Sequence, residues 1–304
     1  DEADNEPGRF FTYFVAALRQ WDESFCPDLF AALHAGQTPP VEMLVTTLVN
    51  AMLGWETRHI LALDDFHHIQ DNTILEALAG LLAHAPPNFH LVLVTREDPP
   101  LPLARLRARG QLTEVRATDL RFSEAEASQL LRDGLRLELP AGDVARLTER
   151  TEGWAAGLQL AGVSLQGREN PGAFVQTLSG SHRFILDYLT EEALKTQPPE
   201  VQDFLLKTAI LPRLNGELCD AVTGRADSAS LLERLLSANL FIIPLDDEGR
   251  WYRYHHLFAE LLQHRLKREC PACLPDLHQR ASRWHEGQDM PVASIEHALA
   301  AGDE

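Results

Sequence analysis

Long apolar runs and positive charge are both lacking in this sequence. No apolar run approaches the roughly 20 residues that a membrane-spanning helix needs. Aspartate and glutamate number 45 against 27 lysine and arginine residues, which gives a formal net charge of −18. A surface of that charge repels nucleic acid. We therefore expect no contact with a membrane, and contact with DNA only through another domain.

Signals for export and for metal binding are lacking as well. The chain opens on acidic residues where a signal peptide carries basic ones, which favours a cytoplasmic location. Of its four cysteines, only Cys270 and Cys273 form a C-x-x-C pair, and a zinc site requires a second pair of ligands. None of the 13 histidines supplies a convincing pair. We expect reduced thiols.

What the sequence does contain is an apolar run that ends in two adjacent carboxylates. Residues 59–63 (His-Ile-Leu-Ala-Leu) fit a strand buried on both faces, as in a parallel sheet, and Asp64 and Asp65 follow. Open α/β sheets bind ligands at the carboxyl ends of their strands. One carboxylate there can hold Mg²⁺, and the next can orient a water for phosphoryl transfer. Alternatively, both are ordinary turn and helix-capping residues.

A second apolar run, residues 89–95, is rich in β-branched residues and predicts a neighbouring strand. Arg96 follows this run and would lie at the same edge of the sheet as Asp64. A fixed cation at that edge could contact a γ-phosphate. A solvated loop arginine is the alternative interpretation of the same residue.

The flanking segments favour a doubly wound α/β fold for the first part of the chain. Helical spacing of apolar residues predicts helices over 9–21, 41–53, 74–83 and 101–109. Residues 112–120 are predicted to form a third strand, with Val115 and Leu120 facing inward. Strands joined by helices make a parallel sheet the economical arrangement.

The remainder of the chain is predicted to be helical apart from one hairpin. A capping box at 123–126 begins a helix to about residue 135, and helices follow over 144–150, 154–165, 173–178, 183–194 and 201–208. A winged helix is predicted from Arg225 onward, with a helix at 230–238, strands at 240–245 and 251–254, and a closing helix at 255–266. Helices at 277–284 and 291–301 resemble the first unit of an α-solenoid.

A phosphate-binding loop is missing from all 304 residues. P-loop NTPases carry G-x-x-x-x-G-K-[ST] before their acidic motif, because its backbone amides and lysine hold the phosphates. No glycine of this sequence is followed by that lysine and hydroxyl pair. Either the first strand and phosphate loop lie upstream of Asp1, or the domain has lost nucleotide binding.

Five separated stretches carry a family resemblance. They are residues 63–67 (LDDFH), 95–107 (TREDPPLPLARLR), 151–161 (TEGWAAGLQLA), 180–189 (GSHRFILDYL) and 252–258 (YRYHHLF). In this order they resemble the MalT-like, LuxR-type ATP-dependent transcriptional regulators. That family is a branch of the STAND class of signal-transduction ATPases. The resemblance covers essentially the whole chain.

The resemblance implies a fold class and a domain order. It implies an incomplete P-loop NTPase-like α/β core with a parallel sheet, followed by an all-α lid, a winged helix and the start of an α-solenoid. The implied ranges are 1–120 for the nucleotide-binding domain, 121–208 for the lid, 209–270 for the winged helix and 271–304 for the start of the repeat sensor. The family's C-terminal helix-turn-helix DNA-binding domain is not among these residues.

The resemblance also implies roles for three residues of the α/β domain. Asp64 resembles the carboxylate that organises Mg²⁺ in the family. Asp65 resembles the carboxylate that positions the attacking water. Arg96 resembles the arginine that senses the phosphate of ATP.

Three residues of the later domains are implied as well. His255 resembles the winged-helix histidine that contacts the β-phosphate of ADP in related switches; a helix-capping or packed histidine is the alternative. Leu158 and Gln159 fall where relatives carry a Leu-Pro pair that lines the adenine, and Gln159 departs from that proline. The apolar stripe around Leu158 is otherwise plain core.

The implied function is a nucleotide switch in a transcriptional regulator. ADP would hold a resting state, and a small-molecule or protein inducer at the repeat domain would favour ATP, Mg²⁺ and a self-associating form. Slow hydrolysis would reset the switch. The rivals are a nucleotide-free interaction scaffold, which the missing phosphate loop favours, and a sensor module fused to a non-DNA-binding output. The chain by itself is expected to have little or no ATPase activity.

Overall fold

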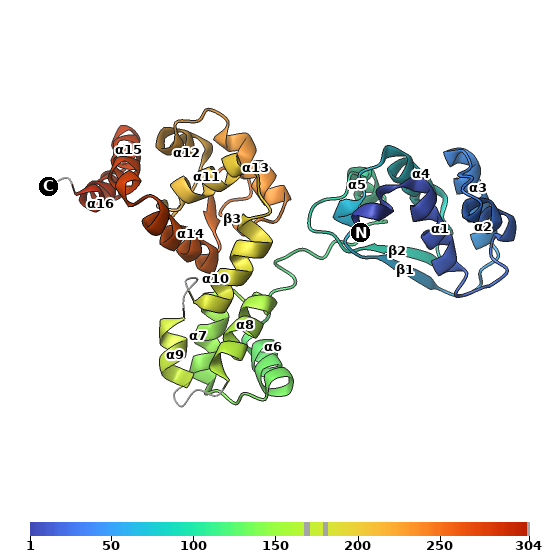
Figure 1. The fold of residues 1–304 in the computed structure, drawn as a ribbon, viewed down its shortest axis with the longest axis horizontal. Coiled ribbons are helices and arrows are strands. Elements are labelled where there is room, and N and C mark those ends of the chain that lie inside the picture. Colours follow the sequence, from blue (N-terminus) through green and yellow to red (C-terminus); the bar gives the residue numbers. More distant parts are fainter. Residues whose placement is uncertain (167–170, 179–181, 303–304) are drawn as a thin grey trace. The chain divides into compact units, whose positions relative to one another are not determined.

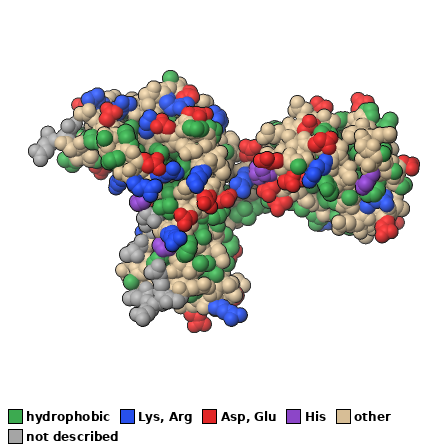
Figure 2. Space-filling view, viewed as in Figure 1, with side chains coloured by type: hydrophobic (Ala, Val, Ile, Leu, Met, Phe, Trp, Pro, Cys, Tyr) green, Lys and Arg blue, Asp and Glu red, His purple; other side chains and the backbone are tan. Residues whose placement is uncertain are grey.

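The chain divides into two compact units in the computed structural model, which describes residues 1–166, 171–178 and 182–302. The first unit is Asp1–Glu114 and the second is Val115–Glu304 (Figure 1). Gly180 and Ser181, the first two residues of the stretch 180–189 that carries part of the family resemblance, lie outside the described residues. On the face of the molecule in Figure 2, acidic and basic side chains are interspersed. Within the described ranges, no helix has the length and apolar character to cross a membrane.

A two-stranded parallel sheet lies at the centre of the first unit. Strand β1 (His59–Leu63) pairs with β2 (Phe89–Leu93), and Leu63 lies opposite Leu93. Helix α4 (Asn72–His84) provides the crossover connection that parallel strands require. The two predicted strands and their parallel pairing are confirmed.

Several further helices and helical turns belong to the first unit. They are η1 (Glu2–Asn5), α1 (Pro7–Leu18), α2 (Pro27–His34), α3 (Val41–Met52), η2 (Phe66–His68) and α5 (Leu103–Ala108). Figure 1 shows α1, α3 and α4 on the same side of the two strands. Their buried faces form one core, which includes Phe11, Leu48 and Leu78. The sequence did not predict η1 or α2, because each is too short to show a clear helical period.

Two expectations about this sheet are wrong. Residues 112–120 form no strand, and Val115 and Leu120 are 64% and 63% exposed. The Asp119 carboxylate instead accepts the Arg116 N–H at 2.8 Å, which closes a turn. Nor is β1 buried on both faces, since Ile60 is 55% exposed. In the part of the chain that the structure describes, helices cover one face of this sheet, and apolar residues on the other face are exposed (Figure 1).

The second unit begins with helices that the sequence largely predicted. They are α6 (Glu124–Gln129), η3 (Leu130–Gly134), α7 (Ala141–Thr151), α8 (Ala155–Leu165), α9 (Pro171–Thr177), α10 (Arg183–Leu189) and η4 (Thr190–Leu194). The predicted capping box is confirmed: the Ser123 hydroxyl accepts the Glu126 N–H, and the Glu126 carboxylate accepts the Ser123 N–H. The turns η3 and η4 are π-helical extensions of α6 and α10.

A winged helix follows. Its elements are α11 (Pro199–Thr208), α12 (Gly216–Thr223), α13 (Ser228–Ser237), β3 (Ile242–Pro244), β4 (Tyr252–Tyr254) and α14 (His256–Glu269). Strands β3 and β4 are antiparallel, with Ile242 opposite Tyr254, so the predicted hairpin is confirmed. The sequence missed α12, an eight-residue helix that Asn215 caps by accepting the Leu218 N–H at 2.7 Å.

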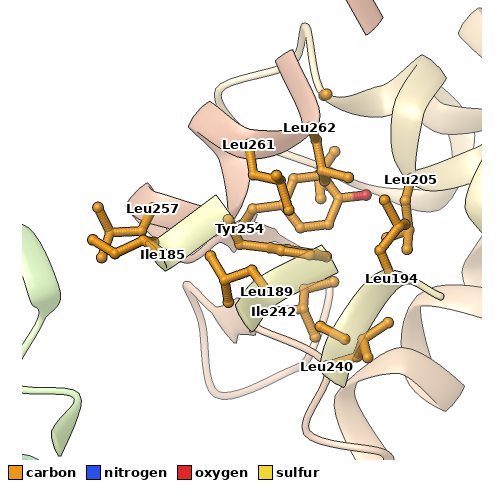
Figure 3. Packing of buried hydrophobic residues seen from close by; sticks show 14 of the residues in the cluster. Ile185, Leu189, Leu194, Leu205, Leu240, Ile242, Tyr254, Leu257, Leu261 and Leu262 are labelled. Carbon is orange, nitrogen blue, oxygen red and sulfur yellow. The ribbon is translucent and has the colours of Figure 1, made fainter. Parts of the chain in front are cut away.

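One apolar core joins α10 to the winged helix. Figure 3 shows Tyr254 of β4 among leucines and isoleucines of α10, α11, β3 and α14. The Tyr254 hydroxyl lies 2.7 Å from Oγ1 of Thr208, and both side chains are buried. Burying each such leucine stabilises the fold by about 1.5–3 kcal/mol relative to exposing it. The hairpin is therefore firmly positioned against α10 and α14.

A helical pair ends the described chain. It consists of α15 (Leu274–Gly287) and α16 (Pro291–Ala301), as predicted; that it begins an α-solenoid stays a prediction. The expectation of reduced thiols is wrong for one pair, since Cys270 and Cys273 form a disulfide. The turn η5 (Pro271–Cys273) brings their Cα atoms to 5.4 Å, within the range a disulfide spans. Cys26 and Cys219 are buried free thiols.

Three histidines lie between α15 and α16. The Nδ1 atoms of His278 and His297 are 2.9 Å apart, and the rings of His285 and His297 stack with centroids at 5.4 Å. Burial, and then the charges of His278 and His285, lower the pKa of His297 to about 4. Burial also lowers the pKa values of the other two.

Acid should loosen this helical pair. A histidine whose pKa is about 4 when folded and 6.5 when unfolded binds fewer protons in the folded state, so stability falls as pH drops through that window. We expect His297→Gln to remove about 3 kcal/mol of this pH dependence, measured by urea unfolding at about pH 4.5 and pH 7.5. His264→Gln, at an exposed histidine of α14, is the control. An unchanged pH dependence in the His297 variant would contradict this account.

Candidate functional site

The two carboxylates singled out by the sequence lie on a tight loop after β1. The Asp64 carboxylate accepts the Asp65 N–H at 2.9 Å, and Asp65 has a left-handed φ of 50°. The chain then returns to the sheet, because the Phe66 N–H donates to the Val94 carbonyl at 2.9 Å. Both carboxylates are exposed. The loop therefore presents them to solvent at the carboxyl end of the sheet.

A cavity of about 380 Å³ borders this loop. Asp64 and Asp65 line it together with side chains from the N-terminal segment and α1, including Arg9. Arg9 is already paired with Asp4, at 2.8 Å between Nε and Oδ1. In the part of the chain that the structure describes, no group of three or more histidine, cysteine or acidic side chains is arranged to hold a metal. Oxygen donors suit Mg²⁺, but water or phosphate oxygens would have to complete its coordination.

Arg96 lies just beyond the end of β2, at the same end of the sheet. The positive charge of Arg96 acts on the nearby His67. The pKa of His67 is lowered chiefly by burial, and then by the charges of His68 and Arg96. Asp65 raises the same pKa, and its Oδ1 lies 3.9 Å from Nδ1 of His67. Asp65 and Arg96 thus both act on one imidazole. No separate pattern in the sequence pointed to His67, although this residue belongs to the LDDFH stretch.

His255 lies in the second unit, and both of its ring nitrogens are engaged. Nε2 donates to the Thr151 carbonyl at 2.9 Å, and Nδ1 accepts the Leu257 N–H at 3.3 Å, which caps α14. The side chain is buried, and burial lowers its pKa, so the ring is neutral at pH 7. His255 is a capping histidine in this conformation. A phosphate could contact Nε2 only after the bond to Thr151 is broken.

Two aromatic rings enclose His255. The rings of Trp154 and Phe241 each lie 6.0 Å from the imidazole, in edge-on orientations. Phe241 has a left-handed φ of 51°, which is rare for a bulky residue and marks local backbone strain. The His255 N–H donates to the Phe241 carbonyl at 2.8 Å. The histidine is therefore fixed by its backbone as well as by its ring.

Leu158 and Gln159 are neighbours in α8 but differ in burial. Leu158 is fully buried in the core of the second unit, whereas Gln159 is exposed. Only the glutamine side chain is accessible to a ligand in this conformation. The six predicted residues thus fall into two sets: Asp64, Asp65 and Arg96 in the first unit, and Leu158, Gln159 and His255 in the second.

The sequence missed a partly buried ion pair close to His255. The Glu152 carboxylate accepts two hydrogen bonds of 2.7 Å from Arg253 and one of 3.0 Å from the His256 N–H. Burial alone would raise the pKa of Glu152, but these donors lower it to about 2. Glu152 and Arg253 are 101 residues apart. In the sequence, Glu152 and Arg253 stood out only because they belong to the TEGW and YRYHH stretches of the family resemblance.

Residues 190–274, which contain the hairpin and His255, match the family model of the MalT winged helix domain. The chain is MalT-like. It is 35% identical over 309 residues to the HTH-type transcriptional regulator MalT of Cronobacter sakazakii, 36% identical over 310 residues to that of Yersinia enterocolitica, and 34% identical over 309 residues to that of Klebsiella pneumoniae. Each alignment covers 100% of this chain and 34% of the relative, so the chain spans about a third of their length.

In this MalT-like chain, substitutions at Leu158 and Gln159 should show which of the two side chains contributes to the core. Leu158→Ala removes a fully buried side chain from the core and should lower the free energy of unfolding by about 2–5 kcal/mol. Gln159→Ala, at the next and exposed residue, should change it by less than about 0.5 kcal/mol. Urea unfolding followed by circular dichroism measures both. Equal effects of the two substitutions would show that Leu158 is not a core residue.

Proposed function

We propose that this chain is the nucleotide-switch region of a signal-responsive transcriptional regulator. Its similarity to MalT regulators over the whole chain supports the regulatory role. One structural observation carries the nucleotide part of the proposal. Asp64, Asp65 and Arg96 follow two parallel strands at their carboxyl ends, where open α/β sheets bind their ligands.

The three residues offer complementary chemistry for a nucleoside triphosphate. The Asp64 carboxylate is a suitable oxygen ligand for Mg²⁺. The Asp65 carboxylate can accept a proton from an attacking water and so orient it. Arg96 offers a permanent cation that can donate hydrogen bonds to a γ-phosphate. Hydrolysis in such a switch is slow and serves to reset it.

His255 is proposed to contact the β-phosphate of ADP in the resting state. It would do so after exchanging the Thr151 carbonyl for a phosphate oxygen, since Nε2 is a donor in both cases. Gln159 is the accessible member of the pair proposed to lie near the adenine. An inducer that prefers the ATP-bound conformation would then raise the affinity for ATP by the same factor as ATP raises the affinity for the inducer.

The proposed partners bind at other places. A small-molecule or protein inducer would bind a helical-repeat domain, DNA would contact a separate C-terminal domain, and the active form would self-associate. The outer face of α16 supports a continuing repeat. Val292, Ile295 and Leu299 lie on one side of this helix and are each more than half exposed, as expected where a further helical unit packs.

A nucleotide-free interaction scaffold is the second candidate. The absence of G-x-x-x-x-G-K-[ST] from the sequence favours it, because the described carboxylates would then have no phosphate cradle beside them. The same exposed face of α16 would in this case bind another protein. A sensor module fused to an output that does not bind DNA is compatible with the same residues.

ATP binding tests the proposal, and the measurement is made on the longest protein that the gene encodes. If a phosphate loop lies upstream, that protein should bind isotope-labelled ATP in the presence of Mg²⁺. Asp64→Ala should weaken this binding roughly 10-fold or more, because a metal ligand is lost. The control is Asp28→Ala, at an exposed carboxylate of the same unit. The 304-residue chain itself should show no measurable turnover.

Two outcomes would count against the proposal, and a third would count against the expectation that the 304-residue chain has no turnover. Unchanged ATP binding in both Asp64→Ala and His255→Ala would remove the assigned roles. Self-association without any ATP binding would favour the scaffold. Turnover by the 304-residue chain that Asp65→Asn abolishes would show that no phosphate loop is needed.

A further inference from the structure

The end of α7 is shaped to direct one carboxylate at the winged helix. Glu152 caps this helix with a left-handed φ of 52°, and Gly153 follows with a φ of 71°. A Cβ on Gly153 would lie 2.6 Å from the Phe122 carbonyl, so no other residue fits there. The Phe122 N–H also donates to the Gly153 carbonyl at 2.8 Å. The backbone is therefore fixed where the Glu152 side chain leaves it.

The Glu152 carboxylate is received by three groups that donate or carry positive charge. Arg253 binds it through both Nη atoms, at 2.7 Å each. The His256 N–H, at the start of α14, adds a bond of 3.0 Å, and negative charge is favourable at a helix N-terminus. Arg121 lies further away, at 3.7 Å. The Glu152 side chain is only 7% exposed, so these contacts replace its water.

Neighbouring residues of α7 contact the same segment. The Thr151 carbonyl accepts Nε2–H of His255 at 2.9 Å, and Arg150 pairs with Glu260 of α14 at 3.1 Å. Three consecutive residues of α7 and its cap thus hold the start of α14 and the strand before it. These contacts are polar, unlike the apolar core that joins α10 to α14.

The Glu152–Arg253 contact is a partly buried ion pair, since the Glu152 side chain is 7% exposed and the Arg253 side chain 26%. Its electrostatic attraction is largely offset by the loss of hydration, so replacing it with apolar residues is often neutral. Removing one partner, however, leaves the other charge without compensation, which is strongly unfavourable. Loss of either partner should therefore weaken the seam between α7 and α14, that is, the set of polar contacts just described.

We propose that Glu152 is a latch that holds the end of α7 on the winged helix, and that opening this latch is the conformational step that exposes His255. Breaking the Glu152–Arg253 pair and the adjoining Thr151–His255 bond frees a guanidinium and an imidazole together. Both are groups that bind phosphate oxygens. The use of this step in a nucleotide switch rests on the proposed function; the latch itself does not.

The test uses the 304-residue chain without nucleotide. Glu152→Gln keeps the shape of the side chain and removes its charge. We expect amide hydrogens of His256 and Leu257 to exchange about tenfold faster, and diethylpyrocarbonate to modify His255 about tenfold faster, with amides of α12 and α15 unchanged. Glu149→Gln, an exposed glutamate of the same helix, is the matched control and should behave as the unaltered chain.

A second variant separates a latch from a general loss of stability. Arg253→Lys keeps the charge but loses the two-pronged hydrogen bonding, and should open the seam less than Glu152→Gln does. In Glu152→Gln combined with Arg253→Gln, opening should be no greater than in either single variant, as for two members of one contact. Faster exchange throughout the second unit would mean that Glu152 only stabilises the fold, and would overturn the proposal. The proposal would also be overturned if diethylpyrocarbonate modified His255 no faster in Glu152→Gln than in the control variant Glu149→Gln.

These outcomes are independent of nucleotide binding. An open seam in Glu152→Gln, together with a longer protein that binds no ATP, would overturn the proposed function and leave the latch. Normal ATP binding, together with a protected His255, would overturn the latch and leave the proposed function.

Discussion

The candidate phosphate-facing site depends on one constraint, the in-register parallel pairing of β1 with β2. Parallel strands end at the same edge of a sheet, so the loops that follow them also begin there. With Leu63 opposite Leu93, the loop of Asp64 and Asp65 starts about one strand spacing, roughly 4.8 Å, from the segment that leads to Arg96. The bond from the Phe66 N–H to the Val94 carbonyl ties that loop to the neighbouring strand. A change of register would separate these groups.

Sequence patterns predicted the features that are set by residues close together in the chain, such as single helices, strands and caps. Asp64 and Asp65 follow an apolar run directly, so their place at the end of a strand could be predicted without knowledge of the fold. Residues 112–120 were wrongly predicted as a strand, because a strand also needs a partner edge, and no short window encodes one. The contact of Glu152 with Arg253 could not be predicted for the same reason. It is made by two segments far apart in the chain, each of which looks like ordinary solvent-exposed charge.

Strand β4 explains how a charged contact and an apolar core can be adjacent in the second unit. Successive side chains of a strand point to opposite faces. Tyr252 and Tyr254 are buried, and Arg253 between them points the other way, toward Glu152. The core thus fixes the strand that carries the arginine. His255 follows directly, so its ring is positioned by the same packing and caps the first turn of α14.

The uncovered face of the small sheet has a consequence for handling this polypeptide. Ile60 of β1 and Val92 of β2 are 55% and 42% exposed, and Val94, just after β2, is 51% exposed. Each strand pairs on only one side among the described residues. Two strands with a bare apolar face and free edges are a template for adding further strands from other molecules. We therefore expect concentrated solutions of the 304-residue polypeptide to associate through this face, and charged substitutions on it to reduce the association.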